Sequence, residues 1–435
     1  MDRMRLGQVP RALVAPSILV ALAVLRPCVA GAFDRVWQPI VIRGAEVPSM
    51  LGARENQIEL TAIRDGALVP IPFQVDERLP DGSYALDQGA APRADDSPGI
   101  LDQDDEIVAM VSDFGVRAGT PAKLARDAVE IELDDPLGGA PRYAYASVVE
   151  HPKLSATRYV DYDSATHTFE TDTFRVGFSN ELETDFAVQS ARNSHVPNLI
   201  DRFKVRISAK VLGIFNFKMT EDDIEKTTLA WHAGPIRVVR ALAHRVRLGF
   251  GLKSPEVTST GLVYRRSIES PFIVSFPWVP RVLFGGVRVR MNLDFVGLDD
   301  FKLMWSGMQM APIGARDSAA IAAAVAQTGD ADIDWVAVRG SGATVVRAFT
   351  PSTDLATLHR RLYLNDSPEV PDPPESVLGE NPGIGFTTLG WEDLSRGRHS
   401  MEMMLAVLPA NYDPAKFYDE LAHPLVVSVR PAMVH

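Results

Sequence analysis

The chain has 435 residues, of which 46% are hydrophobic and 23% are charged, and its formal net charge at pH 7 is −12. This composition excludes an intrinsically disordered chain, and the length predicts either two or three domains or one large β-structure. The net negative charge argues against nucleic acid as a partner, because an acidic surface repels the phosphate backbone.

The first 32 residues have the pattern of a signal peptide. Three arginines come before an apolar run at 12–25, and Ala30 and Ala32 provide the small side chains of a cleavage site. We therefore expect residues 1–32 to be removed and the mature protein to be exported to the periplasm or the extracellular space. No later apolar run is as long as the roughly 20 residues that span a bilayer, so no transmembrane segment is expected after cleavage.

The only cysteine of the chain, Cys28, lies inside this segment. The mature protein is therefore expected to contain no cysteine, which excludes disulfide bonds, thiolate metal sites, cysteine nucleophiles and covalently attached c-type haem. A protein exported without disulfides has to be stabilised by its hydrophobic core, and about 400 residues can bury enough apolar surface for this.

Residues 33–150 are predicted to form an N-terminal β-rich region. Val129, Ile131 and Leu133 alternate there with acidic residues, which is the pattern of a half-buried strand. Residues 151–312 continue as a central region of longer alternating segments, divided by Gly, Pro, Asn and Asp and without helices between them. Such a succession is typical of antiparallel sheets.

Residues 313–435 are predicted to form a C-terminal α+β region that completes the sandwich. One helix is predicted at 316–330, where an alanine-rich segment ends near a glycine, and another at 413–424, which has prolines at its first turn and after its end. A long loop rich in proline and acid is predicted at 365–383. As a whole, the chain is predicted to be mainly β, an antiparallel β-sandwich or supersandwich with a few short helices.

Two acidic turns lie close together near the N-terminus. The segment 70–87 alternates as a strand, turns at an Asp-Gly pair and returns as a second strand. Further on, Asp102, Asp104 and Glu106 have a spacing of oxygen ligands that suits calcium, although the segment lacks the central glycine of an EF-hand loop. Two interpretations stay open: a calcium site, or a solvated turn whose charges protect the following apolar strand from aggregation.

These turns belong to the segment VPIPFQVDERLPDG…LDQDDEIVAMVSDFG, in which P-x-Q-x-D precedes an acidic turn and a strand that begins with Asp-Glu. A later segment, AGPIRVVRALAHRVRL, contains G-P-x-R at the start of a strand. In both features the chain resembles uncharacterised exported bacterial proteins of the domain-of-unknown-function 4861 type. The resemblance implies a galactose-mutarotase-like sandwich and a link to carbohydrate, without assigned catalytic residues. An insertion between the two acidic turns departs from the pattern.

The chain lacks the sequence signatures of serine hydrolases, HExxH metalloenzymes, P-loops and dinucleotide-binding folds. It contains instead a series of alternating cations in the central region. Arg202, Lys204 and Arg206 lie on one side of a single predicted strand, with Phe203 and Val205 on the other. Together with cations on three later strands they form the predicted anion-binding set: Arg202, Lys204, Arg206, Arg245, Arg247, Arg265, Arg266, Arg288 and Arg290.

If these strands are neighbours in one sheet, their guanidinium groups would bind an anionic ligand, such as a uronate-containing sugar, through paired contacts with its carboxylate. In a lyase, an arginine would neutralise that carboxylate while His244 or Tyr264 removed the adjacent proton. The alternative is that these cations only form the solvated face of an antiparallel sheet.

The sequence therefore favours an exported protein of the bacterial envelope that acts as a ligand-binding or accessory module, for a glycan or another anionic ligand. A carbohydrate-active enzyme on the same scaffold, either a lyase or a hydrolase, is one alternative. A structural partner of an envelope protein complex is the other. Calcium is the only cofactor that the sequence suggests.

Overall fold

In the computed structural model, Ala32–His435 form one compact unit. The structure describes residues 33–35, 37–119, 124–179, 182–188, 199–249, 252–254, 256–296, 298, 301–307, 311–312, 323, 325–326, 328–340, 342–355, 357–365, 372 and 382–432. The predicted signal peptide lies outside these residues. No described helix has both the length and the apolar composition needed to cross a membrane.

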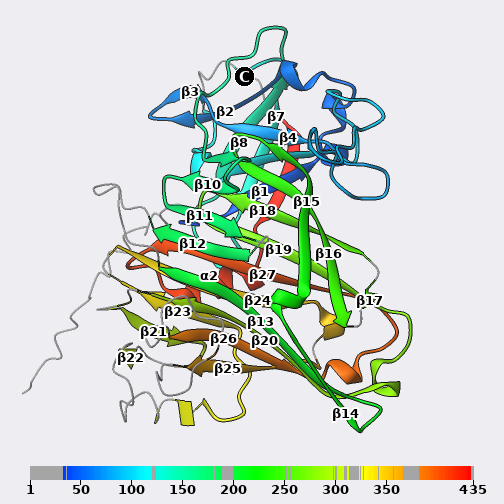
Figure 1. Ribbon diagram of the computed structural model, residues 1–435. Coiled ribbons are helices and arrows are strands. Elements are labelled where there is room, and N and C mark those ends of the chain that lie inside the picture. The colour runs from blue at the N-terminus through cyan, green and yellow to red at the C-terminus, as the bar shows by residue number, and fades with distance from the viewer. Residues whose placement is uncertain are drawn as a thin grey trace, which may run out of the picture. The chain divides into compact units, whose positions relative to one another are not determined.

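Five antiparallel sheets account for most of the described chain, so the fold is mainly β, as predicted (Figure 1). Short 3-10 helices connect many of the strands: η1 (Gly44–Glu46), η2 (Pro48–Met50), η3 (Glu55–Gln57), η4 (Val111–Asp113), η5 (Glu221–Asp223), η6 (Pro280–Val282), η7 (Thr353–Leu355) and η8 (Trp391–Asp393). The α-helix α2 (Pro414–Ala422) confirms the prediction at 413–424, and the side chain of Asp413 caps it by accepting a hydrogen bond from the Ala415 backbone N–H at 3.0 Å.

The helix predicted at 316–330 is described only in part. Ala323, Val325, Ala326 and Thr328 are helical, and the first residues of the predicted helix lie outside the described part of the chain. Most of the predicted loop at 365–383 lies outside it as well.

Two small sheets are built mainly from the N-terminal region. The β6 sheet has the order β1 (Pro39–Arg43), β6 (Glu106–Met110), β4 (Phe73–Asp76). The β7 sheet has the order β28 (Val426–Pro431), β7 (Val129–Asp134), β8 (Arg142–Val148), β2 (Ile58–Arg64), β3 (Ala67–Pro70). Their apolar side chains share one core, in which Ile42, Leu60, Ile107, Ile131 and Leu133 are buried. The alternation seen in the sequence at 129–133 therefore places one row of side chains in this core.

A third small sheet, the β10 sheet, has the order β12 (Leu182–Val188), β11 (Phe174–Ser179), β10 (Thr168–Thr171), β9 (Val160–Asp163). Its inward aromatic residues, Phe169, Phe174 and Phe186, join the main hydrophobic core of the protein.

Two larger sheets contribute most of that main core. The five-stranded β13 sheet has the order β14 (Phe215–Thr220), β13 (Ile200–Val211), β20 (Phe284–Phe295), β26 (Gly383–Leu389), β25 (His359–Asn365). The eleven-stranded β16 sheet has the order β22 (Ala311–Pro312), β21 (Lys302–Trp305), β23 (Trp335–Arg339), β24 (Ala343–Pro351), β27 (Gly397–Pro409), β19 (Ser267–Phe276), β18 (Val257–Tyr264), β16 (Arg237–Gly249), β15 (Ile224–Ala233), β5 (Gln88–Gly89), with β17 (Leu252–Lys253) paired to β16.

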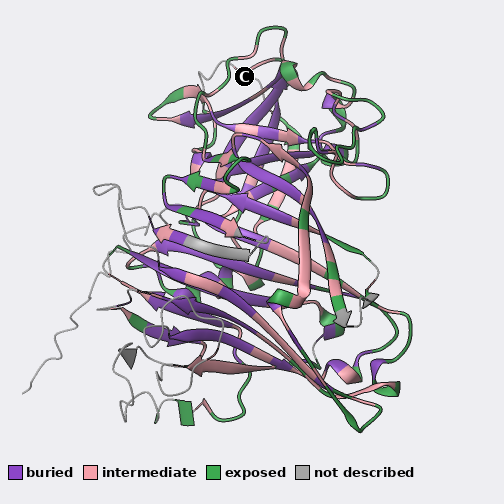
Figure 2. Cartoon of the chain, viewed as in Figure 1, coloured by how far each residue is buried: buried purple, intermediate pink, exposed green. Residues whose placement is uncertain are grey.

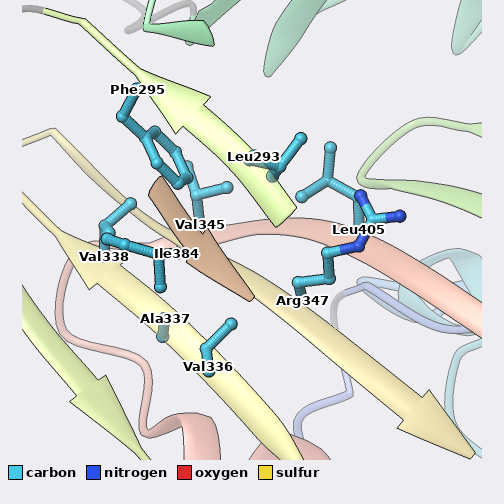
Figure 3. Close-up of a pocket in the computed structure, with 9 residues that line it drawn as sticks. All are labelled: Leu293, Phe295, Val336, Ala337, Val338, Val345, Arg347, Ile384 and Leu405. Carbon is cyan, nitrogen blue, oxygen red and sulfur yellow. The ribbon is translucent and has the colours of Figure 1, made fainter. Parts of the chain in front are cut away.

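The interior between these two sheets is apolar. Figure 3 shows side chains of β20 and β26 opposite those of β23, β24 and β27, around a small cavity lined by Leu293, Phe295, Val336, Ala337, Val338, Val345, Arg347, Ile384 and Leu405. Arg347 is the one charged member of this lining, and its guanidinium lies 4.3 Å from the ring centroid of Phe203. A lining of eight apolar side chains and one arginine does not suit a polar ligand. The polar and charged clusters described below lie outside this cavity.

The three regions named from the sequence are not separate compact units. Strand β28, at the C-terminal end, pairs with β7, and β5, from the N-terminal region, pairs with β15. Strand β27 lies between β19 and β24. The boundaries at 150 and 312 therefore mark changes in sequence pattern, while the sheets combine strands from all three regions.

Candidate functional site

The two acidic segments singled out in the sequence meet on neighbouring strands. Asp76 on β4 lies directly opposite Glu106 on β6, and both residues are buried. Like charges placed opposite each other in a sheet repel, and burial increases the cost. Arg237 on β16 compensates them, because its Nε donates to Asp76 Oδ2 at 2.8 Å and its Nη2 donates to Glu106 Oε2 at 2.6 Å.

Gln74 connects this pair to the G-P-I-R segment. Its Oε1 accepts hydrogen bonds from the backbone N–H groups of Ile236 and Arg237, both at 2.8 Å, and its Nε2 donates to Asp76 Oδ1 at 2.8 Å. A Cβ atom at Gly234 would lie 2.2 Å from Gln74 Oε1. The two segments that carry the family resemblance therefore fit against each other, and the glycine is needed for their close approach.

Two tyrosines complete the site. Tyr264 Oη accepts from Arg237 Nη1 at 2.7 Å, and Tyr84 Oη donates to Glu106 Oε2 at 3.0 Å. We call this group the Arg237 cluster: Gln74, Asp76, Tyr84, Glu106, Arg237 and Tyr264. Arg237 is 1% exposed and Tyr264 2% exposed.

Burial and the neighbouring charges shift the pKa values of Arg237 and of the two tyrosines of the cluster. Burial by itself lowers the pKa of Arg237, but Tyr264, Asp76, Tyr84 and Glu106 raise it well above its ordinary value. Burial raises the pKa of Tyr264 well above its ordinary value and that of Tyr84 to about 12. An arginine that stays charged and phenols that stay neutral do not exchange protons near neutral pH. The role of the cluster is structural, because its hydrogen bonds from β16 to β4 and β6 link the β16 sheet to the β6 sheet.

The predicted calcium ligands are not brought together. Asp102 Oδ1 accepts from the backbone N–H of Asp104 at 2.8 Å, whereas the Glu106 side chain belongs to the Arg237 cluster. Asp105, which the sequence did not single out, accepts from the backbone N–H groups of Asp102 at 2.7 Å and Arg78 at 3.0 Å. Among the described residues there is no group of three or more His, Cys, Asp or Glu that could hold a metal ion. Residues 102–105 form a turn and Glu106 is the first residue of β6, so its side chain follows the strand toward Arg237 and not the turn.

Two acids beside this turn have raised pKa values. Burial raises the pKa of Glu55 to about 7, with Glu77 and Asp105 as the next causes, and burial raises that of Asp105 to about 6. These shifts come first from burial, while the turn itself is held by backbone N–H groups that donate to the carboxylates of Asp102 and Asp105.

Five of the nine predicted anion-binding cations do lie on one face of one sheet. Arg202, Lys204 and Arg206 alternate along β13, and in the adjacent β20 Arg290 lies opposite Arg206 and Arg288 opposite Ser208. Because successive strand residues point to opposite faces, these five share the face that is turned away from Phe203 and the apolar core.

Carboxylates lie among these cations. Lys204 is fully buried and forms an ion pair with Asp294 of β20. Arg290 forms an ion pair with Asp372, which lies in the segment between β25 and β26, and Asp372 is also 3.7 Å from Arg206 Nε and 3.9 Å from Lys204 Nζ. Asp372 therefore touches three of the cations at once.

The η5 turn supplies two further acids. Glu221 pairs with Arg206 and lies 3.7 Å from Arg202, which lies at the same distance from Asp222. Burial lowers the pKa of Arg206. Arg288 is exposed and has no ion pair within the part of the chain that the structure describes.

The other four predicted cations lie elsewhere, on the β16 sheet. Arg245 pairs with Glu256 at 2.9 Å, and Arg247 donates to the backbone carbonyl of Asp222. Arg265 and Arg266 form the turn between β18 and β19, where Arg265 Nε donates to Asp172 Oδ1 at 2.9 Å and Arg266 Nη1 to the carbonyl of Val407 at 3.3 Å. The prediction of one shared patch is therefore wrong for Arg245, Arg265 and Arg266, whereas Arg247 contacts Asp222 of η5, which also lies 3.7 Å from Arg202. Alternation identifies the face of a strand, but not the sheet to which the strand belongs.

The two residues suggested as alternative bases of a lyase, His244 and Tyr264, are also far apart. On the adjacent strands β16 and β18, Tyr264 lies opposite Arg237 and Val257 lies opposite His244, with no break in register between them. Seven residues of a strand correspond to on the order of 20 Å, and an odd separation places the two side chains on opposite faces. His244 Nε2 is 2.6 Å from Ser259 Oγ, and Tyr264 is buried in the Arg237 cluster. The two cannot act on one substrate.

A pair of acids on the β16 sheet was missed by the sequence reasoning. Glu269 on β19 lies opposite Met404 of β27, and Glu402 lies opposite Pro271, so the two glutamates share a face at diagonal positions. Burial and then Glu402 raise the pKa of Glu269 to about 8, and burial raises that of Glu402. The signal in the sequence is an acid within an otherwise apolar strand, as in MEMMLAVL.

No family model and no curated protein matches this chain. Two of the solved structures to which it is similar come from Enterococcus faecalis: an alpha-mannosidase of strain V583, with a TM-score of 0.44, and a protein in glycosyl hydrolase family 38, with a TM-score of 0.46. Each is 8% identical to this chain over 93% of its length, and the chain spans 45% and 47% of theirs. Similarity at this level carries no inference about function.

Proposed function

We propose that this chain is an exported binding module that holds an anionic carbohydrate on the outward face of the β13 sheet. The observation that carries the proposal is the Arg206–Arg290 pair, in which two cations lie directly opposite each other on neighbouring strands. Two like charges in this arrangement repel, so the position is stable only with an anion between them.

Asp372 provides that anion within the chain. Its carboxylate lies against both arginines and against Lys204. It is also partly exposed, as are the arginines: the side chains of Arg206, Arg290 and Asp372 retain 17%, 20% and 20% of their accessible surface. A uronate presents the same carboxylate, which a guanidinium binds through two parallel hydrogen bonds. We infer that a ligand carboxylate replaces that of Asp372.

Other features of the surroundings suit a sugar acid. The ring centroid of Tyr363 on β25 lies 4.3 Å from the Arg290 guanidinium, and this aromatic ring offers an apolar surface next to the cations. The signal-peptide pattern of the sequence predicts export to the periplasm or out of the cell, where acidic glycans would be met.

The test is a calorimetric titration of the mature chain with oligogalacturonate, and with a neutral mannan oligosaccharide for comparison. We expect oligogalacturonate alone to bind, and the double variant Arg206→Gln/Arg290→Gln to lose at least tenfold in affinity, since each charge-assisted contact contributes roughly 1.5–3 kcal/mol. The matched control is Arg245→Gln, which removes an exposed arginine of the β16 sheet and should bind as the unmodified chain does.

The variant Asp372→Asn tests whether a ligand carboxylate replaces that of Asp372 or whether Asp372 only stabilises the fold. If the ligand competes with Asp372, this variant binds oligogalacturonate more tightly. Affinity that falls in Asp372→Asn, or that is unchanged in the double arginine variant, would count against the proposed site.

A second candidate function is a carbohydrate-active enzyme, and the Glu269–Glu402 pair is the observation that favours it. Two carboxyl groups, one of which stays protonated near neutral pH, are the acid and base equipment of a glycoside hydrolase. The test is release of reducing sugar from the same oligosaccharides by the unmodified chain and by Glu269→Gln. Turnover that is lost in the variant, with oligosaccharide binding retained, would establish the enzyme in place of the binding module.

A further inference from the structure

Six large apolar side chains are exposed together at one end of the β13 sheet. Three belong to the hairpin between β13 and β14, and three to the connection between β19 and β20. We call them the hairpin-end patch: Leu212, Ile214, Phe215, Trp278, Val279 and Val282, which are 60%, 74%, 62%, 49%, 43% and 70% exposed. Such a concentration differs from the scattered single apolar residues that are normal on a soluble surface.

The two parts of this patch are joined through the backbone. The N–H of Leu212 donates to the carbonyl of Leu283 at 2.8 Å, and Val211 pairs with Phe284 at the start of β20. The hairpin lies at the lower right of Figure 1, beside the label β14, and Figure 2 shows exposed residues at this end of the strands. The patch is therefore one surface made from two turns.

The cations next to the patch distinguish it from an ordinary protein interface. Lys210 lies opposite Asn216 across the hairpin, and Ser208 lies opposite both Lys218 and Arg288. Lys210, Lys218 and Arg288 are exposed, and none of them has a carboxylate partner within the described residues. They lie on the outward face of the sheet within a few residues of the apolar tips.

The acids close to the patch are already engaged. Asp393 of η8 pairs with Arg281 of η6. Glu392 accepts hydrogen bonds from the backbone N–H groups of Gly286 at 2.8 Å and Val287 at 3.2 Å. The surface around the hairpin end is therefore locally cationic on a chain whose net charge is −12.

We propose that the hairpin-end patch docks this protein on an anionic lipid surface. Exposed leucine, isoleucine and phenylalanine at turn tips can enter the boundary between headgroups and acyl chains, and tryptophan is favoured at that depth. Lysine and arginine directly behind the tips would meet the lipid phosphates, each adding affinity that falls with salt. The remainder of the acidic surface would be repelled by the same membrane, which orients the protein with this end inward.

Docking on lipid is independent of the proposed glycan site. The membrane contacts are the turn tips and Lys210, Lys218 and Arg288, whereas the glycan contacts are Arg206 and Arg290. The lipid-docking proposal can therefore fail while the glycan-binding proposal holds, and the reverse.

The experiment is sedimentation of the mature chain with vesicles of phosphatidylcholine alone and of phosphatidylcholine mixed with phosphatidylglycerol. We expect binding to the mixed vesicles and little to the neutral ones. Ile214→Ser/Phe215→Ser should weaken binding about a hundredfold, since each buried side chain is worth about a factor of ten. Lys210→Gln/Lys218→Gln should weaken it roughly fivefold per charge and reduce the preference for phosphatidylglycerol, with Arg288 left as the remaining cation.

Matched controls keep the result interpretable. Val257→Ser and Val426→Ser remove apolar side chains that are 52% and 53% exposed and lie outside the patch, and both should bind as the unmodified chain does. Because all substituted positions are exposed, folding is checked by the unfolding midpoint, which should not move. Three outcomes would overturn the proposal: no sedimentation with either vesicle, equal binding by the patch variants, or a concentration-dependent dimer that disappears in Ile214→Ser/Phe215→Ser.

Discussion

Two charged clusters of this protein use the same chemistry, arginine against carboxylate, with different surroundings. In the Arg237 cluster, Asp76 and Glu106 lie on two strands of one sheet, and the three charged side chains are 10% exposed or less. On the β13 sheet, Arg206 and Arg290 are about a fifth exposed, and the Asp372 carboxylate comes from outside the strands. The first arrangement holds two sheets together, and in the second we propose that a ligand carboxylate replaces that of Asp372.

The difference has an energetic consequence. Buried charges that lose their partner remain in a poorly polarisable interior, whereas exposed charges recover their hydration. The following predictions test this contrast, from the largest expected effect to the smallest.

Arg237→Met should destabilise the protein by about 3–5 kcal/mol, because buried Asp76 would lose its cation and lie opposite Glu106, which would keep only Arg78, at 3.5 Å. The measurement is the free energy of urea unfolding. Arg245→Met, which breaks the exposed pair with Glu256, serves as control and should cost less than about 1 kcal/mol. Equal losses in the two variants would refute the contrast.

Gly234→Ala should cost about 1–3 kcal/mol, because its Cβ would lie 2.2 Å from Gln74 Oε1, which two backbone N–H groups hold in place. Gly285→Ala is the matched control, since no atom lies within 4 Å of a Cβ added there. In the background Gln74→Ala, the cost of the alanine at 234 should largely disappear. A loss of the same size in that background would mean that Gln74 is not the obstacle.

Glu269→Gln should change how stability depends on pH. The folded pKa of Glu269, about 8, lies above its ordinary value of 4.5, so between these values the folded state binds the proton more strongly. The contribution of this group to stability is therefore present below about pH 4.5 and is lost as the pH rises to about 8. The glutamine variant should be more stable than the unmodified chain at pH 8, by on the order of 4 kcal/mol, and similar to it at pH 4.5. Parallel curves for the two proteins would show that Glu269 ionises normally.

Arg290→Gln should cost less than about 1 kcal/mol of stability, because its ion pair with Asp372 is partly exposed. The measurement is the same urea unfolding curve. A loss as large as that of Arg237→Met would show that the Arg206–Arg290 site is a fixed structural element, and the proposed exchange of its carboxylate would then be untenable.

The local patterns of the sequence predicted several elements of the fold correctly. The alternation at 129–133 forms β7 with its apolar side chains in the core, and the segment 413–424 forms α2. The turn predicted after β4 is present, although Tyr84 returns only as an isolated bridge to Arg78. These features depend on residues close together in the chain, so composition and spacing are sufficient to predict them.

The candidate sites were predicted less completely. Alternation along β13 correctly placed Arg202 and Arg206 on one face with Lys204, but it did not predict that Lys204 is buried against Asp294. The motifs around Gln74 and Arg237 were visible as a resemblance, without any indication that they contact each other. Glu269 and Glu402 were not noticed, because they are adjacent only through the pairing of β19 with β27.

The sequence by itself determined which side chains share a face of each strand, where turns interrupt the strands, and that the chain is mainly β. Only the tertiary structure decided which strands become neighbours: Arg430 of β28 reaches Glu130 of β7 across 300 residues, and the cations of β13 and β16 belong to different sheets. The physical reason is that a period of two is a property of the single strand. The choice of partner strand depends on packing between distant segments, which local spacing does not encode.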